Sequence, residues 1–232
     1  LVSQEGVRTM HMSESALPAS VVDQVQAVPG VQRAVPILYT ESMLEAKGNE
    51  YIVYVFGVSP DAPFGGPWRI VDGAATPGPA EVIIDHAIAT QAGLRVGDQV
   101  TVLGQDMNIA GLTSGTSSLA SSVSFVRMDD FARVRGGSDV ISFVLVEVQA
   151  GESPSAVSAR IAQSVGGVTV QTRQEFATAE RKLVGDMSAD IINIMNTAGF
   201  LTGLAVVVLT VYIATVARRR EYGVLKAMGV RN

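Results

Sequence analysis

The sequence predicts an α+β fold in which an α/β unit is interrupted by a β-rich insertion and followed by one long helix. Short apolar runs rich in β-branched residues alternate with helical patterns over residues 1–172. Five prolines gather in residues 59–79, as is typical of a connection between two parts of a domain. Residues 191–217 then contain no Asp, Glu, Lys, Arg or His, which favours a helix in an apolar environment.

The first elements expected are a helix and a hairpin. Residues 18–30, PASVVDQVQAVPG, predict a short helix that begins with a capping box of Ser20 and Asp23 and stops at the Pro-Gly pair. Two strand patterns follow, over residues 31–46 and 50–58. The intervening KGNE predicts a Gly-Asn turn.

The insertion is expected to be a compact β-rich unit. Its patterns predict a strand at 81–84, a helix at 85–91 that ends at Gly93, strands at 99–103 and 107–113, and a further strand before residue 128. A short helix from Met128 to Arg135 is expected directly after the insertion.

The α/β unit then resumes. Residues 139–150, DVISFVLVEVQA, form the clearest strand pattern in the chain. A helix follows with Ser153 as N-cap and Pro154 at its first position, and residues 167–172 predict a last strand. The predicted parts are the α/β unit (1–58 and 128–172), the β-rich insertion (59–127), a stalk helix (173–190), a transmembrane helix (191–217) and a terminal segment (218–232).

The apolar segment is long enough to cross a membrane. Phe176, Leu183, Met187, Ile191 and Ile194 recur at helical spacing, so the stalk is expected to continue into the segment as one helix. At 1.5 Å per residue the 27 residues would extend roughly 40 Å, against a hydrocarbon core of about 30 Å. The alternative is a buried core helix of a soluble protein, but such helices rarely run this long without a charge.

The distribution of charge orients the predicted span. Residues 1–190 hold 12 basic and 21 acidic side chains, a net charge of −9, whereas residues 218–232 hold 5 basic and 1 acidic, a net charge of +4. Arginines directly after a span favour the cytoplasmic side and contact with membrane lipid. We therefore expect a cell-membrane protein with residues 1–190 extracytoplasmic and 218–232 cytoplasmic. The acidic body argues against nucleic acid as a partner.

Two glycines in the span, Gly199 and Gly203, form a small-xxx-small pair. Such a pair allows another helix to approach closely. The pattern is common, so it indicates either ordinary helix packing or a specific dimer face.

The sequence shows no constellation for catalysis or metal binding. It has no cysteine, and His11 and His86 are far apart and lack ligand spacing, with His86 expected at the surface. Asp129 and Asp130 are adjacent at a helix start, where solvated carboxylates favour the helix dipole. No phosphate-binding Walker loop occurs, so any ATP would bind to another polypeptide or to a part of the protein outside this sequence. We therefore predict no enzyme activity, no metal and no cofactor in this chain.

Three stretches resemble one family. ARRREYGVLKAMGV (217–230) is similar to the segment after the second membrane helix of MacB/LolC/FtsX-like ABC transporter permeases. Residues 81–115, from EVIIDHAIATQAG to GLTSG, resemble the extracytoplasmic core domain of that family. LPASVVDQVQAVPGVQRAVP (17–36) is similar to the part after the first membrane helix. The sequence departs from the family pattern because it lacks the first membrane helix and the last two.

The resemblance implies a porter-like α/β lobe with an inserted β-rich lobe, on a stalk between two membrane helices. It implies a cytoplasmic coupling segment that contacts a separate ABC ATP-binding subunit, a second permease copy or homologue in a dimer, and an outer substrate or partner protein. Within the coupling segment, arginines would anchor the helix end at headgroups, apolar side chains would face the ATPase, and two charged residues would form the rim. The coupling residues so identified are Arg218, Arg219, Arg220, Glu221, Val224, Leu225, Lys226 and Met228, with Gly229 ending the helix.

Two other classes of function remain open on the sequence. One is a membrane-anchored extracytoplasmic binding or scaffold module without ATPase coupling. The other is a tethered enzyme, which the missing constellation disfavours.

Overall fold

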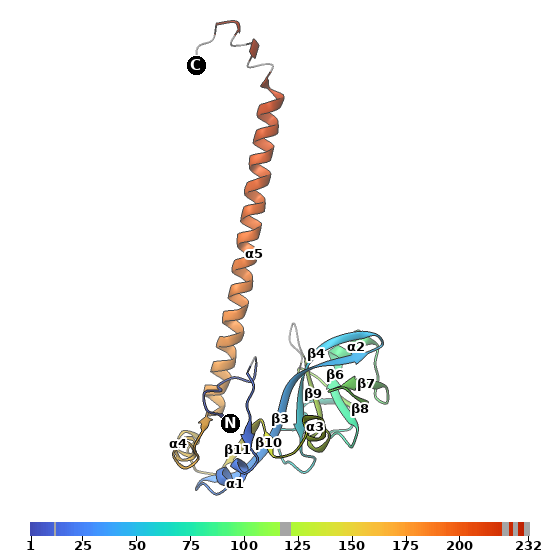
Figure 1. Ribbon diagram of the computed structural model, residues 1–232, viewed down its shortest axis with the longest axis vertical. Coiled ribbons are helices and arrows are strands. Elements are labelled where there is room, and N and C mark those ends of the chain that lie inside the picture. The colour runs from blue at the N-terminus through green and yellow to red at the C-terminus, as the bar shows by residue number, and fades with distance from the viewer. Residues whose placement is uncertain (12, 117–121, 220–222, 225–226, 230–232) are drawn as a thin grey trace. The chain divides into compact units, whose positions relative to one another are not determined.

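The computed structural model describes residues 1–11, 13–116, 122–219, 223–224 and 227–229. The chain consists of two units, Leu1–Glu180 and Arg181–Asn232. The first is a folded unit that holds the strands and the four shorter helices, and the second continues the long helix α5 (Figure 1).

The described strands and helices follow one another in a mixed order. The strands are β1 (Val2–Gln4), β2 (Leu17–Pro18), β3 (Val31–Ala46), β4 (Asn49–Val58), β5 (Ile70–Gly73), β6 (Glu81–Asp85), β7 (Gln99–Val102), β8 (Gln105–Thr113), β9 (Ser122–Arg127), β10 (Val140–Ile141), β11 (Phe143–Val148) and β12 (Val168–Val170). The helices are α1 (Val21–Gln26), α2 (His86–Ala92), α3 (Met128–Arg135), α4 (Pro154–Ser164) and α5 (Arg173–Ala217).

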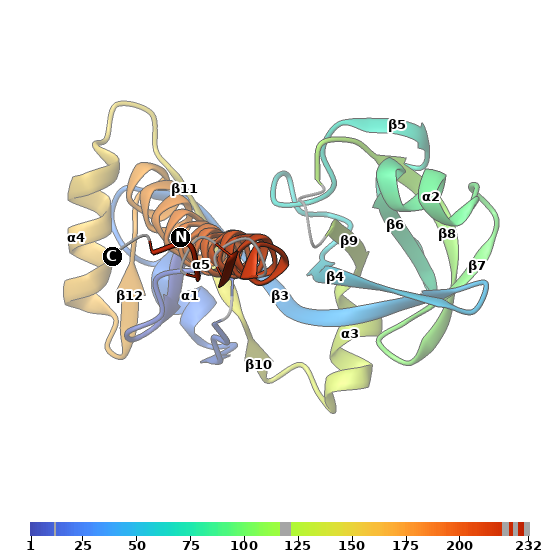
Figure 2. The same cartoon turned by 90° about the horizontal axis from the view of Figure 1, so that it is seen from above.

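One end of the folded unit is an antiparallel sheet in the order β12-β1-β11-β3. Helix α4 packs next to β12, and α1 packs on β3 (Figure 2). Val2, Val144, Val157 and Ile161 are almost completely buried between these elements. Burial of a Val or Ile side chain contributes about 1.5–3 kcal/mol, so this small core can hold three short strands in place.

Strand β3 belongs to both ends of the folded unit. Its first part, 31–37, pairs with β11, and its second part, 38–46, pairs with β4. From there the pairing runs β3-β4-β9-β6-β8-β7 and returns to β3, where Leu44 lies opposite Val102. These six strands form a closed barrel (Figure 2). Closure leaves no long unpaired edge along that path.

The structure confirms the predicted α+β fold class and several of its elements. The stalk and apolar segment form one helix, α5, with the predicted ends. Helix α2 is capped by the Asp85 side chain, which accepts a hydrogen bond of 2.7 Å from the Ala87 N–H. It ends at Gly93, whose φ of 63° suits a glycine C-cap. Helix α3 has the predicted bounds.

Two local predictions were wrong. The β3–β4 turn is formed by Lys47 and Gly48, both with positive φ, because Ala46 pairs with Asn49; the predicted Gly-Asn turn lies one residue too late. The capping box at α1 is not formed, because Ser20 has helical backbone angles and its side chain makes no cap hydrogen bond.

Strand boundaries also differ from the prediction. The clearest strand pattern is divided at Ser142, a buried residue whose Oγ accepts a hydrogen bond of 2.9 Å from the Tyr39 N–H. Strand β1 lies before the first predicted element, and strand β5 lies in the proline-rich segment predicted to be a connection. One continuous sheet runs through residues on both sides of Val58, so the division into two lobes there stays a prediction.

Candidate functional site at the base of the long helix

The apolar part of α5 carries large hydrophobic side chains that are exposed in the described chain. Its side chains are exposed throughout, including Ile194 at 69% and Phe200 at 71%. Among the described residues, α5 is the one helix long and apolar enough to cross a membrane.

The threonines of this segment bond to their own helix. The hydroxyls of Thr197, Thr202, Thr210 and Thr215 each donate to the carbonyl four residues earlier, at 2.8 Å. These bonds satisfy polar groups that would otherwise be costly to place in hydrocarbon.

Gly199 and Gly203 lie one turn apart on this exposed helix. A Cβ atom added at either glycine would meet nothing within 4 Å. Both positions are open to a neighbouring helix, and the predicted packing role stays a prediction.

The predicted coupling segment is described only in part. Arg218 and Arg219 directly follow α5. Val224 is 58% exposed and Met228 is 68% exposed, and the Met228 N–H bonds to the Val224 carbonyl at 3.1 Å. The remaining predicted coupling residues, Arg220, Glu221, Leu225 and Lys226, lie outside the described residues. Gly229 has a φ of 87°, which suits the end of a helix.

The first turn of α5 is held by a reciprocal capping box. Thr172 donates from its N–H (2.8 Å) and its hydroxyl (2.9 Å) to Glu175 Oε2, and the Glu175 N–H returns a bond of 3.3 Å to Thr172 Oγ1. The backbone bond from Thr172, followed by its hydroxyl bond, lowers the pKa of Glu175. The helix start is thereby fixed directly after β12.

Two turns later, Glu180 ties α5 to the loop between β1 and β2. Its Oε1 accepts the Met10 N–H at 2.5 Å, and its Oε2 lies 2.5 Å from His11 Nδ1. The Glu180 side chain is 14% exposed and that of His11 is 38% exposed. The His11 ring also meets Tyr54 edge to face, with centroids 4.9 Å apart. The Glu180 carboxylate thus joins α5 to the β1–β2 loop, and β4 contacts the same histidine through Tyr54.

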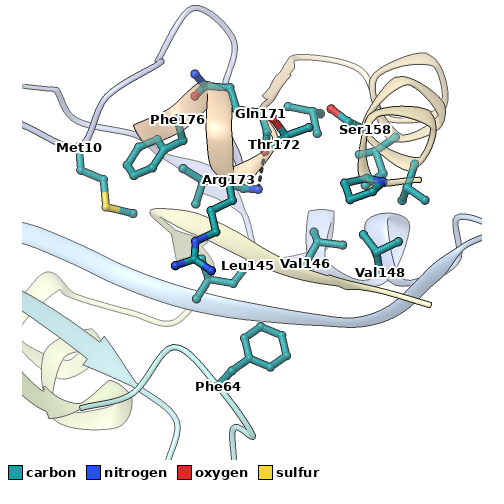
Figure 3. A pocket seen from close by; sticks show the side chains of 15 residues that line it. Met10, Phe64, Leu145, Val146, Val148, Ser158, Gln171, Thr172, Arg173 and Phe176 are labelled. Carbon is teal, nitrogen blue, oxygen red and sulfur yellow. Dashed lines mark hydrogen bonds between the residues drawn. The ribbon is translucent and has the colours of Figure 1, made fainter. Parts of the chain in front are cut away.

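An apolar pocket lies beside this base (Figure 3). It has a volume of about 470 Å³ and lies among α4, β11, β12 and the first turn of α5. Phe176 reaches it from α5, Met10 from the β1–β2 loop and Phe64 from the loop after β4. Gly65 brings that last loop close, because a Cβ there would be 2.5 Å from Leu145 Cδ1.

Sequence reasoning missed this base. The T-x-x-E spacing of Thr172 and Glu175 is a capping-box signal that was available. His11 and Glu180 carried no such signal, because a lone histidine and one of many helical glutamates form no recognisable pattern.

The structure shows where His86 and the Asp129–Asp130 pair lie. His86 is exposed, as predicted. Asp129 is exposed and pairs with Arg127, but Asp130 is only 4% exposed, so its assignment as a solvated cap was wrong. Asp130 accepts the Ala80 N–H at 2.8 Å and holds the loop before β6. Over the described ranges, no three His, Asp or Glu side chains gather as a metal site would require.

The chain resembles known proteins over most of its length. Residues 2–164 match the sequence model of the MacB-like periplasmic core domain. Uncharacterized ABC transporter permeases of Mycobacterium bovis and Mycobacterium tuberculosis are 24% identical over 209 residues, which is 89% of this chain and 55% of theirs. The chain therefore spans about half the length of these curated relatives.

Two solved structures have a similar fold. The periplasmic region of MacB from Actinobacillus actinomycetemcomitans gives a TM-score of 0.58 at 10% identity, with 77% of this chain and 90% of that one covered. The extracellular domain of the noncanonic ABC-type transporter YknZ from Gram-positive bacteria gives 0.56 at 13% identity, with 74% and 98% covered. At these identities the likeness establishes the fold.

Proposed function

The chain belongs to the MacB-like periplasmic core domain family, and on that premise we propose that it is part of the permease subunit of an ABC-type transporter. In this proposal a separate ATP-binding subunit drives motion of α5, and α5 transmits it to the extracytoplasmic domain. The motion serves export, extraction or mechanical signalling. The permease character is supported by the relatives named above.

The observation that carries this proposal is the continuity of α5. One helix runs from Arg173 to Ala217 without a break. Its first turns are fixed to the folded unit by the Thr172–Glu175 cap and by Glu180. A helix that is hydrogen-bonded from turn to turn is stiff along its axis, so displacement at one end reaches the other.

The composition of α5 supports its placement in the cell membrane. Residues 191–217 would lie in lipid, because they belong to a helix that is long and apolar enough to cross a membrane and their side chains are exposed. By the positive-inside rule, the arginines that begin at Arg218 support an orientation in which residues 218–232 would lie in the cytoplasm and residues 1–190 outside.

The partners follow from the two ends of the span. Arg218, Arg219 and Arg220 would lie at lipid headgroups. The apolar side chains Val224, Leu225 and Met228 would contact the ATP-binding subunit, with Glu221 and Lys226 at the rim. Gly199 and Gly203 would face a second permease copy or homologue. ATP would bind to the ATP-binding subunit, and the folded unit would contact the outer substrate or partner protein.

Co-purification tests the proposed coupling. The intact parent permease is tagged in its native membrane, and captured ATP-binding subunit is measured by ATPase activity and mass spectrometry. We expect Leu225→Asp and Glu221→Lys to release the subunit, because each changes the proposed contact face. Val184→Asp, on the exposed stalk, is the control and should retain it.

Each other outcome of this experiment is informative. Retention of the ATPase by Leu225→Asp and Glu221→Lys would remove residues 218–229 from the contact. Absence of any ATPase with the unmutated permease would favour a membrane-anchored binding or scaffold module.

A further inference from the structure

We propose that the pocket at the base of α5 binds a single-chain carboxylic acid of the fatty-acid class, with the chain in the pocket and the carboxylate on Arg173. This inference concerns the folded unit alone and does not depend on transport. Its ligand would occupy the 470 Å³ volume described above, within the range of about 300–1,000 Å³ that small-molecule pockets span.

The lining suits a hydrocarbon chain. Eleven of its fifteen residues are apolar, and they come from β11, α4, β12, α5, the residue before β1, the β1–β2 loop and the loop after β4. These residues are Leu1, Met10, Phe64, Leu145, Val146, Val148, Pro154, Val157, Ile161, Val170 and Phe176. Apolar surface of this kind gains about 25 cal/mol for each Å² that a ligand removes from water.

One cation lies over this apolar surface. Arg173 is the only charged side chain among the fifteen lining residues. Figure 3 shows its guanidinium extending from the start of α5 toward Leu145, across the apolar side chains. Arginine binds carboxylates with two parallel hydrogen bonds, so this position selects an anionic head group.

The guanidinium is available for a ligand. The acid closest to it in the sequence, Glu175, already accepts two hydrogen bonds from Thr172. Within the described chain, no salt bridge joins Arg173 to any Asp or Glu. A bound carboxylate could therefore form an ion pair with Arg173 without displacing an Asp or Glu of the protein.

The polar side chains of the lining favour a lipid acid over a peptide. An extended peptide would bring amide groups that must be paired. Thr172 is occupied by the cap, and the Gln171 side chain in Figure 3 points away from the apolar residues. Ser158 on α4 is the remaining polar side chain, which suffices for one head group but not for a peptide backbone.

Photo-crosslinking tests the proposal on the whole chain in phospholipid nanodiscs. The probes are hexadecanoic acid and hexadecanol, each with a diazirine in the chain, and labelled peptides are mapped by mass spectrometry. We expect the acid to label residues 145–161 and 170–176, in competition with unlabelled hexadecanoic acid. Arg173→Gln should weaken labelling by the acid about tenfold, as expected for the loss of a charge-assisted bond. Labelling by the alcohol should not change.

Two matched pairs of variants keep the test independent of folding. Ser158→Phe should fill the pocket and abolish labelling, whereas Ala159→Phe, on the exposed side of α4, should not. Lys182→Gln removes a charge farther along α5 and should leave labelling by the acid unchanged. Labelling confined to residues 191–217, or equal labelling of Ser158→Phe and the unmutated chain, would overturn the proposal. Equal loss for both probes in Arg173→Gln would overturn the role of the guanidinium.

Discussion

The base of α5 and its apolar segment belong to one helix but are stabilised in opposite ways. At the base, residues 173–180 are fixed by polar contacts to the folded unit, and Glu180 is largely shielded from water. In residues 191–217 the side chains are apolar and exposed, and the hydroxyls bond within the helix. The comparison shows that the base of α5 is held by contacts within the protein, whereas the composition of the apolar segment suits an apolar solvent such as lipid.

The largest effect is expected in the apolar segment. Leu204→Arg places a charge near its centre, which costs about 2.5–3.5 kcal/mol on insertion scales. We expect a marked loss of the chain from the carbonate-resistant membrane fraction. Ser188→Arg, outside the segment, is the control. Equal membrane retention of both variants would break the distinction between the two parts of α5.

Glu180 holds the base of α5 to the β1–β2 loop. Glu180→Ala removes the acceptor for Met10 and the partner of His11. Hydrogen bonds to a charged group are worth about 1.5–3 kcal/mol, and partial exposure of His11 places the expected loss near the lower end. Hydrogen exchange of residues 7–13 should become faster. Glu180→Gln keeps one acceptor, so its exchange rate should lie between those of the unmutated chain and Glu180→Ala. An unchanged exchange rate in Glu180→Ala would contradict the anchoring role.

The loop that carries Phe64 to the pocket depends on a glycine. Gly65 has a φ of 86°, and a Cβ there would clash with Leu145. Gly65→Ala should destabilise the folded unit by about 1 kcal/mol or more. Denaturant unfolding followed by Trp68 fluorescence measures this loss. Gly66→Ala has open space at its Cβ and no positive φ, so it is the control; an equal effect of the two would contradict the need for a positive φ at residue 65.

The smallest effect concerns the capping box and its dependence on pH. The pKa of Glu175 is lower in the folded state than its ordinary value of 4.5. The ionised Glu175 therefore stabilises the fold fully above pH 4.5, and this stabilisation is lost as the pH falls through the pKa of the folded state. Thr172→Ala should destabilise the first turn of α5 at neutral pH, because it removes the side-chain hydrogen bonds of the cap. Hydrogen exchange of residues 173–176 measures both the effect of Thr172→Ala and its dependence on pH. The difference between Thr172→Ala and the unmutated chain should shrink in acid, and a constant difference would contradict the cap.

Sequence reasoning recovered those parts of the fold that local signals specify. The C-terminal end of α5 was predictable because an apolar run of that length meets arginine at residue 218. Helix α2 was predictable because Asp85 and Gly93 are adjacent to it. The closure of the barrel was not, because Leu44 and Val102 are paired across 58 residues by packing that no local pattern encodes.

The candidate site was harder to predict than the fold. Met10 and Glu180 are 170 residues apart, and the bond between them depends on the β1–β2 loop returning to α5. The strand that positions this loop, β1, has three residues and is held by two distant partners, β11 and β12. A strand that short carries too few residues to show a period.

Single-cysteine labelling tests the central claim, that α5 spans the membrane, most directly. The chain has no native cysteine, so Ser188→Cys, Leu204→Cys and Arg219→Cys each give one unique site. With a membrane-impermeant maleimide, position 188 should react in intact cells, position 219 only after the membrane is opened, and position 204 in neither case. Reaction of position 219 in intact cells, or of position 204 as fast as position 188, would contradict the account.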